Sequence, residues 1–190
     1  MEVREPPATY TDYAALPETG PRYEIMGGMG TLSPAPDSKH QCISANLTAI
    51  LHRHISPARL GLVFAAPCDV VLSETDVIQP DLLFVTEARK SIVKGRGIFG
   101  APDLVVEILS PATRQRDTTE KYKLYARYGV REYWVIDPGD FTVVLWTSAG
   151  RPLDRRAVFA GGGEMESEVL PGLAVRLAEI FAGVEEIGEE

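Results

Sequence analysis

Two acidic residues stand in parts of the chain that are otherwise apolar, and they are the first candidates for chemistry. Glu107 lies inside the run Leu-Val-Val-Glu-Ile-Leu, and Asp81 begins the run Asp-Leu-Leu-Phe-Val. An ionised carboxylate that leaves water without a partner is costly. Glu107 therefore needs a cation, a hydrogen-bonded partner or a position at the open end of its strand.

Two carboxylates on neighbouring strands would suit a divalent metal ion. Hard oxygen ligands, completed by a backbone carbonyl and waters, are what Mg²⁺ or Mn²⁺ prefers. Such an ion could polarise a phosphodiester, help to generate hydroxide and stabilise the leaving oxygen. A nearby lysine would stabilise the charge of the transition state or position the attacking water. Asp81 and Glu107 are therefore candidate metal ligands.

The elements around Glu107 read as a strand, a helix and a second strand. Residues 103–109 have the composition of a strand covered on both faces, residues 113–128 have helical period, and residues 131–136 form another strand pattern. This order favours a parallel, right-handed crossover. Asp117 and Lys121 share the apolar stripe of the helix, so they should point toward the sheet. The alternative is an exposed ion pair with a snorkelling lysine.

The remaining pattern predicts a single α/β (α+β) domain over residues 1–190, with flexible ends at 1–8 and 185–190. Strand alternation alone favours a solvent-facing position for Glu24, which lies in the first strand of a hairpin. Residues 87–100 read as a basic connection that is partly helical or mobile. The other predicted elements are helices at 9–16, 38–55 and 177–181, the hairpin 22–26 with 29–33, and strands at 61–66, 69–72, 80–85, 141–147, 157–159 and 168–170.

Charge is distributed unevenly along the chain. The formal net charge is −8, which argues against a nucleic-acid partner because phosphate binding needs Lys and Arg. Residues 89–131, however, contain ten basic and four acidic residues, a surplus of six positive charges, so the remainder of the chain carries −14. A basic segment around Glu107 points to an anionic substrate, and an ordinary solvated helix face is the alternative.

Cysteine and histidine patterns exclude several other classes of site. The two cysteines have no metal-type spacing, and the N-terminus has no apolar signal segment, which favours a cytoplasmic protein with free thiols. The longest apolar stretch is interrupted by Gly, Pro and Asp, so no membrane span is expected. The three histidines lack the spacing of a zinc site, and only His40, near a helix start, is of interest.

Several motifs, taken together in order, resemble the Uma-two family of restriction-endonuclease-like proteins within the PD-(D/E)XK nuclease superfamily. The resemblance covers most of the chain. Its motifs are Arg-Tyr-Glu-Ile at 22–25, Ser-Pro at 33–34 with His-Gln at 40–41, Gln-Pro-Asp-Leu-Leu-Phe-Val at 79–85, Ala-Pro-Asp-Leu-Val-Val-Glu-Ile-Leu-Ser-Pro at 101–111, Asp117 with Lys121 and Tyr125, Gly-Val-Arg-Glu-Tyr-Trp-Val-Ile-Asp-Pro at 129–138, and Leu-Pro-Gly-Leu at 170–173.

This resemblance implies a restriction-endonuclease-like core, a mixed sheet flanked by helices, with an added hairpin region at each end. It implies Asp81 and Glu107 as metal ligands and Glu24 as an accessory acidic residue. The superfamily pattern would place a lysine two positions after the acidic ligand, where this sequence has Leu109. A lysine moved to the next helix is a known variation, and Lys121 fits it.

The leading hypothesis is a Mg²⁺- or Mn²⁺-dependent endonuclease that cuts phosphodiester bonds, in DNA rather than RNA, with Asp81, Glu107, Lys121 and Glu24 as catalytic residues. A second hypothesis is a non-catalytic nucleic-acid-binding or interaction protein that keeps the fold, which Leu109 and the overall acidity favour. A third is a hydrolase for a small phosphate ester. Nucleases of this fold often act as dimers, so a homodimer is also expected.

Overall fold

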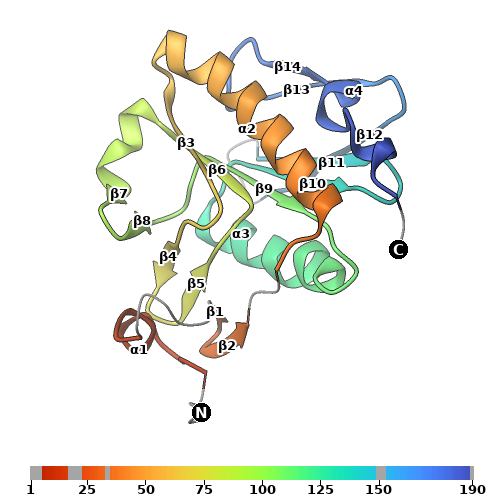
Figure 1. Ribbon diagram of the computed structural model, residues 1–190. Coiled ribbons are helices and arrows are strands. Elements are labelled where there is room, and N and C mark those ends of the chain that lie inside the picture. Colours follow the sequence, from red (N-terminus) through yellow and green to blue (C-terminus); the bar gives the residue numbers. More distant parts are fainter. Residues whose placement is uncertain (1–5, 17–22, 33–34, 149–152, 189–190) are drawn as a thin grey trace.

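A mixed sheet at the centre of the molecule holds the strands around both candidate carboxylates (Figure 1). The structure is a computed structural model that describes residues 6–16, 23–32, 35–148 and 153–188. Within these residues the sheet has the order β12-β11-β10-β9-β6-β3, in which only β9 and β10 are parallel. The strands are β3 (Gly61–Ala65), β6 (Leu82–Thr86), β9 (Leu104–Ile108), β10 (Glu132–Asp137), β11 (Thr142–Thr147) and β12 (Arg155–Ala160).

A second sheet extends from the N-terminal hairpin and brings Glu24 toward the first sheet. Its order within the described residues is β2-β1-β5-β4-β8-β7. Its strands are β1 (Tyr23–Met26), β2 (Met29–Leu32), β4 (Val70–Ser73), β5 (Asp76–Ile78), β7 (Val93–Lys94) and β8 (Gly97–Phe99). In Figure 1 the β1–β2 hairpin lies at the bottom and the β7–β8 hairpin at the left, so this sheet spans the side of the molecule.

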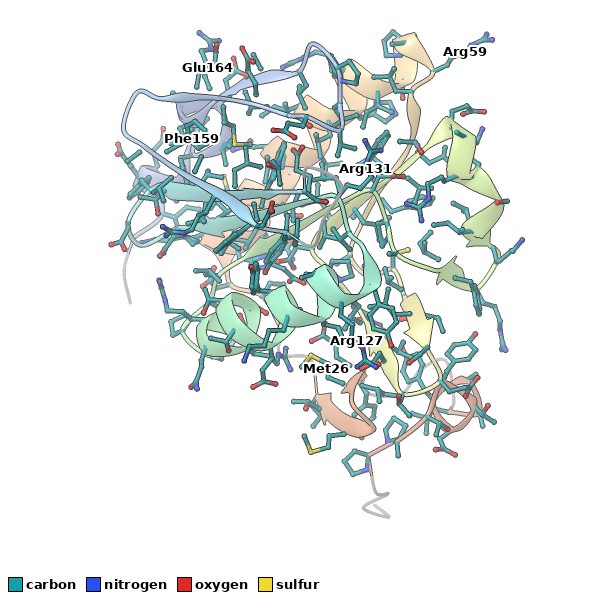
Figure 2. The ribbon with its side chains drawn as sticks, turned by 180° about the vertical axis from the view of Figure 1, so that it is seen from behind. Met26, Arg59, Arg127, Arg131, Phe159 and Glu164 are labelled. Carbon is teal, nitrogen blue, oxygen red and sulfur yellow. The ribbon has the colours of Figure 1, made fainter. Side chains whose placement is uncertain are left out.

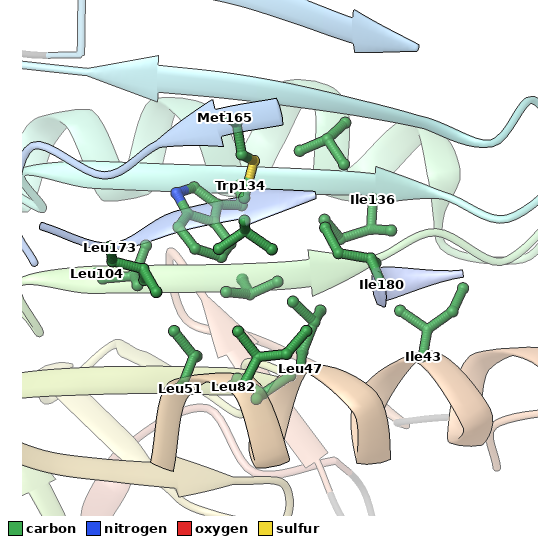
Figure 3. Packing of buried hydrophobic residues seen from close by; sticks show 14 of the residues in the cluster. Ile43, Leu47, Leu51, Leu82, Leu104, Trp134, Ile136, Met165, Leu173 and Ile180 are labelled. Carbon is green, nitrogen blue, oxygen red and sulfur yellow. The ribbon is translucent and has the colours of Figure 1, made fainter. Parts of the chain in front are cut away.

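The long helix α2 (Ser38–Ala58) covers one face of the central sheet, as its apolar period predicts. Figure 3 shows this core, in which α2 faces the strands. It includes Ile43, Leu47 and Leu51 of the helix, and Leu82, Leu104, Trp134 and Ile136 of the sheet. The C-terminal elements close the same core: β13 (Glu164–Glu166), β14 (Ala174–Arg176), α4 (Leu177–Ile180) and η3 (Val184–Glu186).

The crossover helix covers the opposite face. It consists of a π-helical segment, η2 (Arg116–Lys121), followed by α3 (Tyr122–Tyr128), and it ends at Gly129 in the left-handed conformation. Figure 2, seen from behind, shows α3 lying across the sheet, with Arg127 near its end. Leu124 and Tyr125 pack against Tyr133 in a second core cluster, which the strands of the second sheet complete. The predicted parallel crossover is therefore confirmed.

Most predicted elements are confirmed, including the N-terminal helix α1 (Tyr10–Ala14) with Thr9 as its cap. One predicted strand is wrong: residues 168–170 are not a strand, because the short C-terminal sheet pairs residues 164–166 with 174–176. The prediction that residues 87–100 are partly helical is confirmed by the 3-10 helix η1 (Glu87–Ile92), which the unpredicted β7–β8 hairpin follows. Strand β5 was not predicted.

Arg22 and Ser33, the outer residues of the predicted N-terminal hairpin, lie outside the described residues, as do residues 1–5 and 189–190 of the predicted flexible ends. The single-domain prediction and the flexibility of the ends stay predictions. Among the described residues, none of the helices has the length and apolar character that a membrane crossing requires.

Candidate active site

The register of β6 against β9 brings the two candidate carboxylates together. The two strands are antiparallel, and Leu82 pairs with Val106. Asp81 comes directly before Leu82 and Glu107 directly after Val106, so the two acidic residues lie opposite each other. The Asp81 carboxylate accepts a hydrogen bond of 2.7 Å from the backbone N–H of Ile108 through Oδ2. Asp81 is therefore held at the end of β9 from which Glu107 projects toward α3.

Lys121 lies between three carboxylates. Its Nζ is 2.9 Å from Oε1 of Glu107, 2.9 Å from Oε1 of Glu24 and 3.4 Å from Oδ1 of Asp117. The lysine side chain is only 3% exposed. The predicted inward direction of Lys121 and Asp117 is confirmed, and the alternative of an exposed ion pair is wrong.

Glu24 is buried, at 2% exposure, and not solvent-facing as strand alternation alone favours. The reason is that the segment η2 covers the face of β1 that was expected to meet solvent. Glu24 Oε1 accepts from the backbone N–H of Gln79 at 3.0 Å, and Oε2 lies 2.7 Å from the guanidinium of Arg116. The N-terminal hairpin thus delivers a third carboxylate to the site.

The π-helical turn explains how several residues of η2 reach the same place. A π turn is wider than an α turn, so residues four and five apart share a face. Arg116 and Lys121 both contact Glu24, and Asp117 contacts Lys121. Single π turns of this kind are frequent at functional sites.

Two contacts of the site were not assigned from the sequence. The hydroxyl of Tyr125 donates to Oε1 of Glu107 at 2.5 Å, the same oxygen that Lys121 contacts. Nε2 of His40 lies 3.1 Å from Oδ2 of Asp81. Both residues carried a signal: Tyr125 lies four positions after Lys121 on one helical stripe, and His40 lies near the start of α2.

Leu109 is a core residue. It is 5% exposed, packs in the second core cluster and does not line the hollow around Glu107. The side chain two residues after Glu107 is therefore part of the hydrophobic core, and the amine near the carboxylates comes from Lys121.

The basic surplus of residues 89–131 is largely committed to ion pairs. Arg114 pairs with Asp137 at 2.6 Å, and Arg89 and Arg131 pair with the buried Asp103 at 3.0 and 3.4 Å. Together with Lys121, these residues account for much of the charge that suggested an anionic substrate.

A hollow of about 430 Å³ opens beside Glu107 and Lys121. Its lining includes Glu24, His40, Asp81, Glu107, Asp117 and Lys121. Asp81 and Glu107 each use one carboxylate oxygen in contacts within the described residues, which leaves Oδ1 of Asp81 and Oε2 of Glu107 without a hydrogen bond there. Each carboxylate therefore has one oxygen fixed by the protein and one available.

The charges of the site are unbalanced toward the negative. Four carboxylates face two permanent cations, Lys121 and Arg116, with His40 beside them. Burial and the charges of Asp117, Asp81 and Glu24 raise the pKa of Glu107 well above its usual range, although Lys121 opposes this. Burial alone would lower the pKa of Lys121, but the surrounding carboxylates raise it, so the amine stays charged. Burial is the largest cause of the shift at Glu107, and the neighbouring negative charges add to it.

A divalent ion fits this donor set. Within the described residues no three His, Cys, Asp or Glu side chains are arranged to enclose a metal ion. Mg²⁺ is commonly held by only one or two carboxylates with waters in the other positions, so a cage of three side chains is not required. The available oxygens of Asp81 and Glu107, and the excess of negative charge, are the features such an ion needs.

The sequence matches the family described as Uma2, "Putative restriction endonuclease", over residues 10–178. The chain belongs to the Uma2 family. The match spans the N-terminal helix, both sheets and the crossover helix, and it therefore includes every residue of the site. The family resemblance inferred from the sequence motifs is confirmed.

A solved structure shares the fold. It is the crystal structure of a putative nuclease belonging to DUF820 from Anabaena variabilis, with a TM-score of 0.79 and 24% sequence identity over 94% of this chain and 99% of that chain. At this identity the likeness shows the fold, and it confirms the predicted mixed sheet flanked by helices. No curated protein matches the chain.

Proposed function

We propose that this Uma2 protein is a nuclease that uses Mg²⁺ or Mn²⁺ to hydrolyse phosphodiester bonds in DNA. The observation that carries the proposal is the meeting of Glu24, Asp81, Glu107 and Lys121, from four separate elements, in one hollow. Membership of a family described as "Putative restriction endonuclease" supports the same reaction class.

Asp81 and Glu107 would hold the metal through their available oxygens. Backbone and side-chain donors fix the other oxygen of each: the N–H of Ile108 for Asp81, and Lys121 with Tyr125 for Glu107. A bound ion would supply positive charge for the phosphodiester oxygens and acidify a water molecule. This arrangement explains why two carboxylates are tolerated beside a buried sheet.

Lys121 acts as a cation and not as a base, because three carboxylates keep its amine protonated. A charged amine beside Glu107 stabilises negative charge that develops on the phosphate in the transition state. Glu24 of the N-terminal hairpin contacts this amine directly, and Arg116 of η2 holds the other oxygen of Glu24. Their role is to orient Lys121.

Nicking of supercoiled plasmid DNA with Mg²⁺ or Mn²⁺ tests the proposal. Asp81→Asn and Glu107→Gln remove charge from the proposed ligands at nearly constant size, and each should reduce nicking at least about 100-fold, as loss of a metal ligand removes several kcal/mol of transition-state stabilisation. Glu120→Gln is the matched control, because Glu120 is an exposed carboxylate of η2. It should nick like the wild type.

Equal nicking by wild type, Asp81→Asn and Glu107→Gln would contradict the assignment of the site. Wild-type protein that binds DNA and Mg²⁺ but cuts neither DNA nor RNA would favour the second hypothesis, a non-catalytic nucleic-acid-binding protein. The observation that favours this second function is Leu109, which stands where the superfamily pattern has a lysine.

A further inference from the structure

A second hollow, of about 340 Å³, adjoins the candidate active site. Pro67 and Gln79 line both hollows, so the two lie side by side. Gln79 links them physically: its backbone N–H donates to Glu24, and its side-chain amide donates to Asp69 at 2.6 Å. A chain-like ligand in the first hollow could continue into the second.

The rim of the second hollow carries two cations. Lys94 and Arg96 lie on the β7–β8 hairpin, both are exposed, and neither makes an ion pair within the described residues. In the same basic segment, Arg89, Arg114 and Arg131 are all paired with carboxylates. The charge of Lys94 and Arg96 is therefore available to a ligand.

The hairpin is held in place by backbone contacts. Its strand β8 pairs in parallel with β4, and the N–H of Ile98 donates to the carbonyl of Asp69 at 2.8 Å. Gly97 has φ +145°, and a Cβ there would lie 2.6 Å from the same carbonyl oxygen, so only glycine allows this approach. The two cations thus stand on a fixed support at the edge of the second sheet, at the left of Figure 1.

The lining of the second hollow includes two aromatic side chains. Tyr13 and Phe64 line it, and the one carboxylate there, Asp69, already accepts from the Tyr13 hydroxyl and the Gln79 amide. Aromatic rings beside exposed cations are the combination that binds a nucleic-acid strand, with the rings against bases and the cations against phosphates.

We propose that the β7–β8 hairpin and the second hollow bind the nucleic-acid strand next to the phosphate that is cut, with Lys94 and Arg96 contacting its backbone. The inference rests on the proposed nuclease function, since that function places the reacting phosphate in the adjoining hollow. The shared chemistry is a phosphodiester backbone with bases, and DNA and RNA are distinguished by the experiment.

The test is binding of fluorescein-labelled oligonucleotides, measured by anisotropy in EDTA so that no cutting occurs. Single-stranded DNA, duplex DNA and RNA are titrated with the wild type and with Lys94→Ala/Arg96→Ala at several salt concentrations. Loss of two phosphate contacts should lower the slope of log K against log salt by about 1.4 to 1.8 and weaken binding about tenfold or more. The nucleic acid that shows this change is the one the hairpin binds.

Two further variants keep the test specific. Arg59→Ala/Lys123→Ala removes two exposed cations that line neither hollow, and its slope should stay within about 0.5 of the wild type. Lys94→Arg/Arg96→Lys keeps both charges and should keep the wild-type slope, which shows that charge and not local folding is responsible.

The outcome is separable from that of the nicking assay. If Lys94→Ala/Arg96→Ala keeps the wild-type slope, or if the wild type binds none of the three oligonucleotides, the inference is overturned even when plasmid nicking is observed. If the slope falls as expected while no nicking is detected under any condition, nucleic-acid binding by the hairpin stands and the proposed catalytic function fails.

Discussion

At the scale of single residues, Lys121 determines the electrostatics of the site. A buried ammonium is tolerated because Glu24, Glu107 and Asp117 surround it. Removing one partner of a buried ion pair leaves the other charges uncompensated, which costs far more than the pair itself contributes. The lysine therefore matters for stability as well as for the proposed chemistry.

Lys121→Met should lower the free energy of unfolding by about 3 to 5 kcal/mol, because three buried carboxylates lose their shared cation. Urea unfolding followed by circular dichroism measures this change. Lys123→Met removes an exposed lysine two positions along the same helix and should change stability by less than about 0.5 kcal/mol. Similar losses in both variants would contradict the buried role of Lys121.

Tyr125→Phe should reduce nicking, because Glu107 loses one of the two donors that fix its Oε1. It should also destabilise the protein by about 1 kcal/mol. Tyr122→Phe is the matched control, since its hydroxyl donates to the carbonyl of Leu153, away from the carboxylates. That variant should lose comparable stability in urea but keep its nicking rate; equal nicking by both would argue against a positioning role for Tyr125.

Sequence patterns predicted some residues of the site and missed others for a physical reason. Glu107 and Asp81 were recognisable because a carboxylate in an apolar run is costly to bury. The burial of Glu24 was not recognisable from the sequence, because alternation in β1 tells which residues share a face but not what covers that face. Arg116 was missed because it reaches the site only through a π turn, which helical period of 3.6 does not describe.

At the scale of elements, the N-terminal hairpin is fastened to the crossover helix by Asp76 of β5. Its carboxylate accepts from the backbone N–H of Gly27 at 2.8 Å and from the hydroxyls of Ser73 and Tyr128 at 3.0 and 2.6 Å. One buried side chain thus joins the hairpin turn and the end of α3. The position of Glu24 depends on this connection.

Asp76→Asn should show the contribution of this connection through its pH dependence. Burial would raise the pKa of Asp76, but the donors from Tyr128, Gly27 and Ser73 hold it below its ordinary value of 3.8. The ionised group therefore stabilises the fold above pH 3.8, and this contribution is lost as pH falls further. The free energy of unfolding in urea should differ between wild type and variant by about 1.5 to 3 kcal/mol at pH 6, and the difference should shrink as pH falls from 3.8 through the lowered pKa of Asp76. A difference independent of pH would contradict this account.

The long elements were predictable and the short ones were not. α2, β9 and the crossover have enough residues for a period to be visible, and the structure confirms them. Strands β5, β7 and β8 have two or three residues each, too few for a period, and they exist because the neighbouring strands pair with them. Tertiary pairing, not local propensity, determines such strands.

At the scale of the whole molecule, the proposed metal site couples ligand binding to folding. An ion that binds only the folded protein stabilises it, by about 1.4 kcal/mol when the metal concentration is ten times the dissociation constant. Mg²⁺ or Mn²⁺ should therefore raise the temperature of thermal unfolding of the wild type and of Glu120→Gln. Asp81→Asn and Glu107→Gln should lose this shift; an equal shift in all four proteins would mean that the ion binds elsewhere.

The expected homodimer stays a prediction at this scale. Met29 and Leu32 are exposed on the edge strand β2, at 73% and 56%, and Val158 is exposed on the edge strand β12 at 52%. Sedimentation velocity measures the mass in solution directly. A single species near 20.8 kDa at all concentrations would exclude the dimer.

The assembly of the site from distant strands also has a consequence for folding kinetics. Glu24 and Lys121 contact each other although they are 97 positions apart in the chain, and Asp81 and Glu107 lie between them. Contacts at such separations require large loops to close, and proteins dominated by them fold slowly. During synthesis Glu24 and Asp81 emerge well before Lys121, so they stay hydrated until the crossover helix docks. The proposed nicking activity should therefore return with the last phase of refolding, after the local helices have formed.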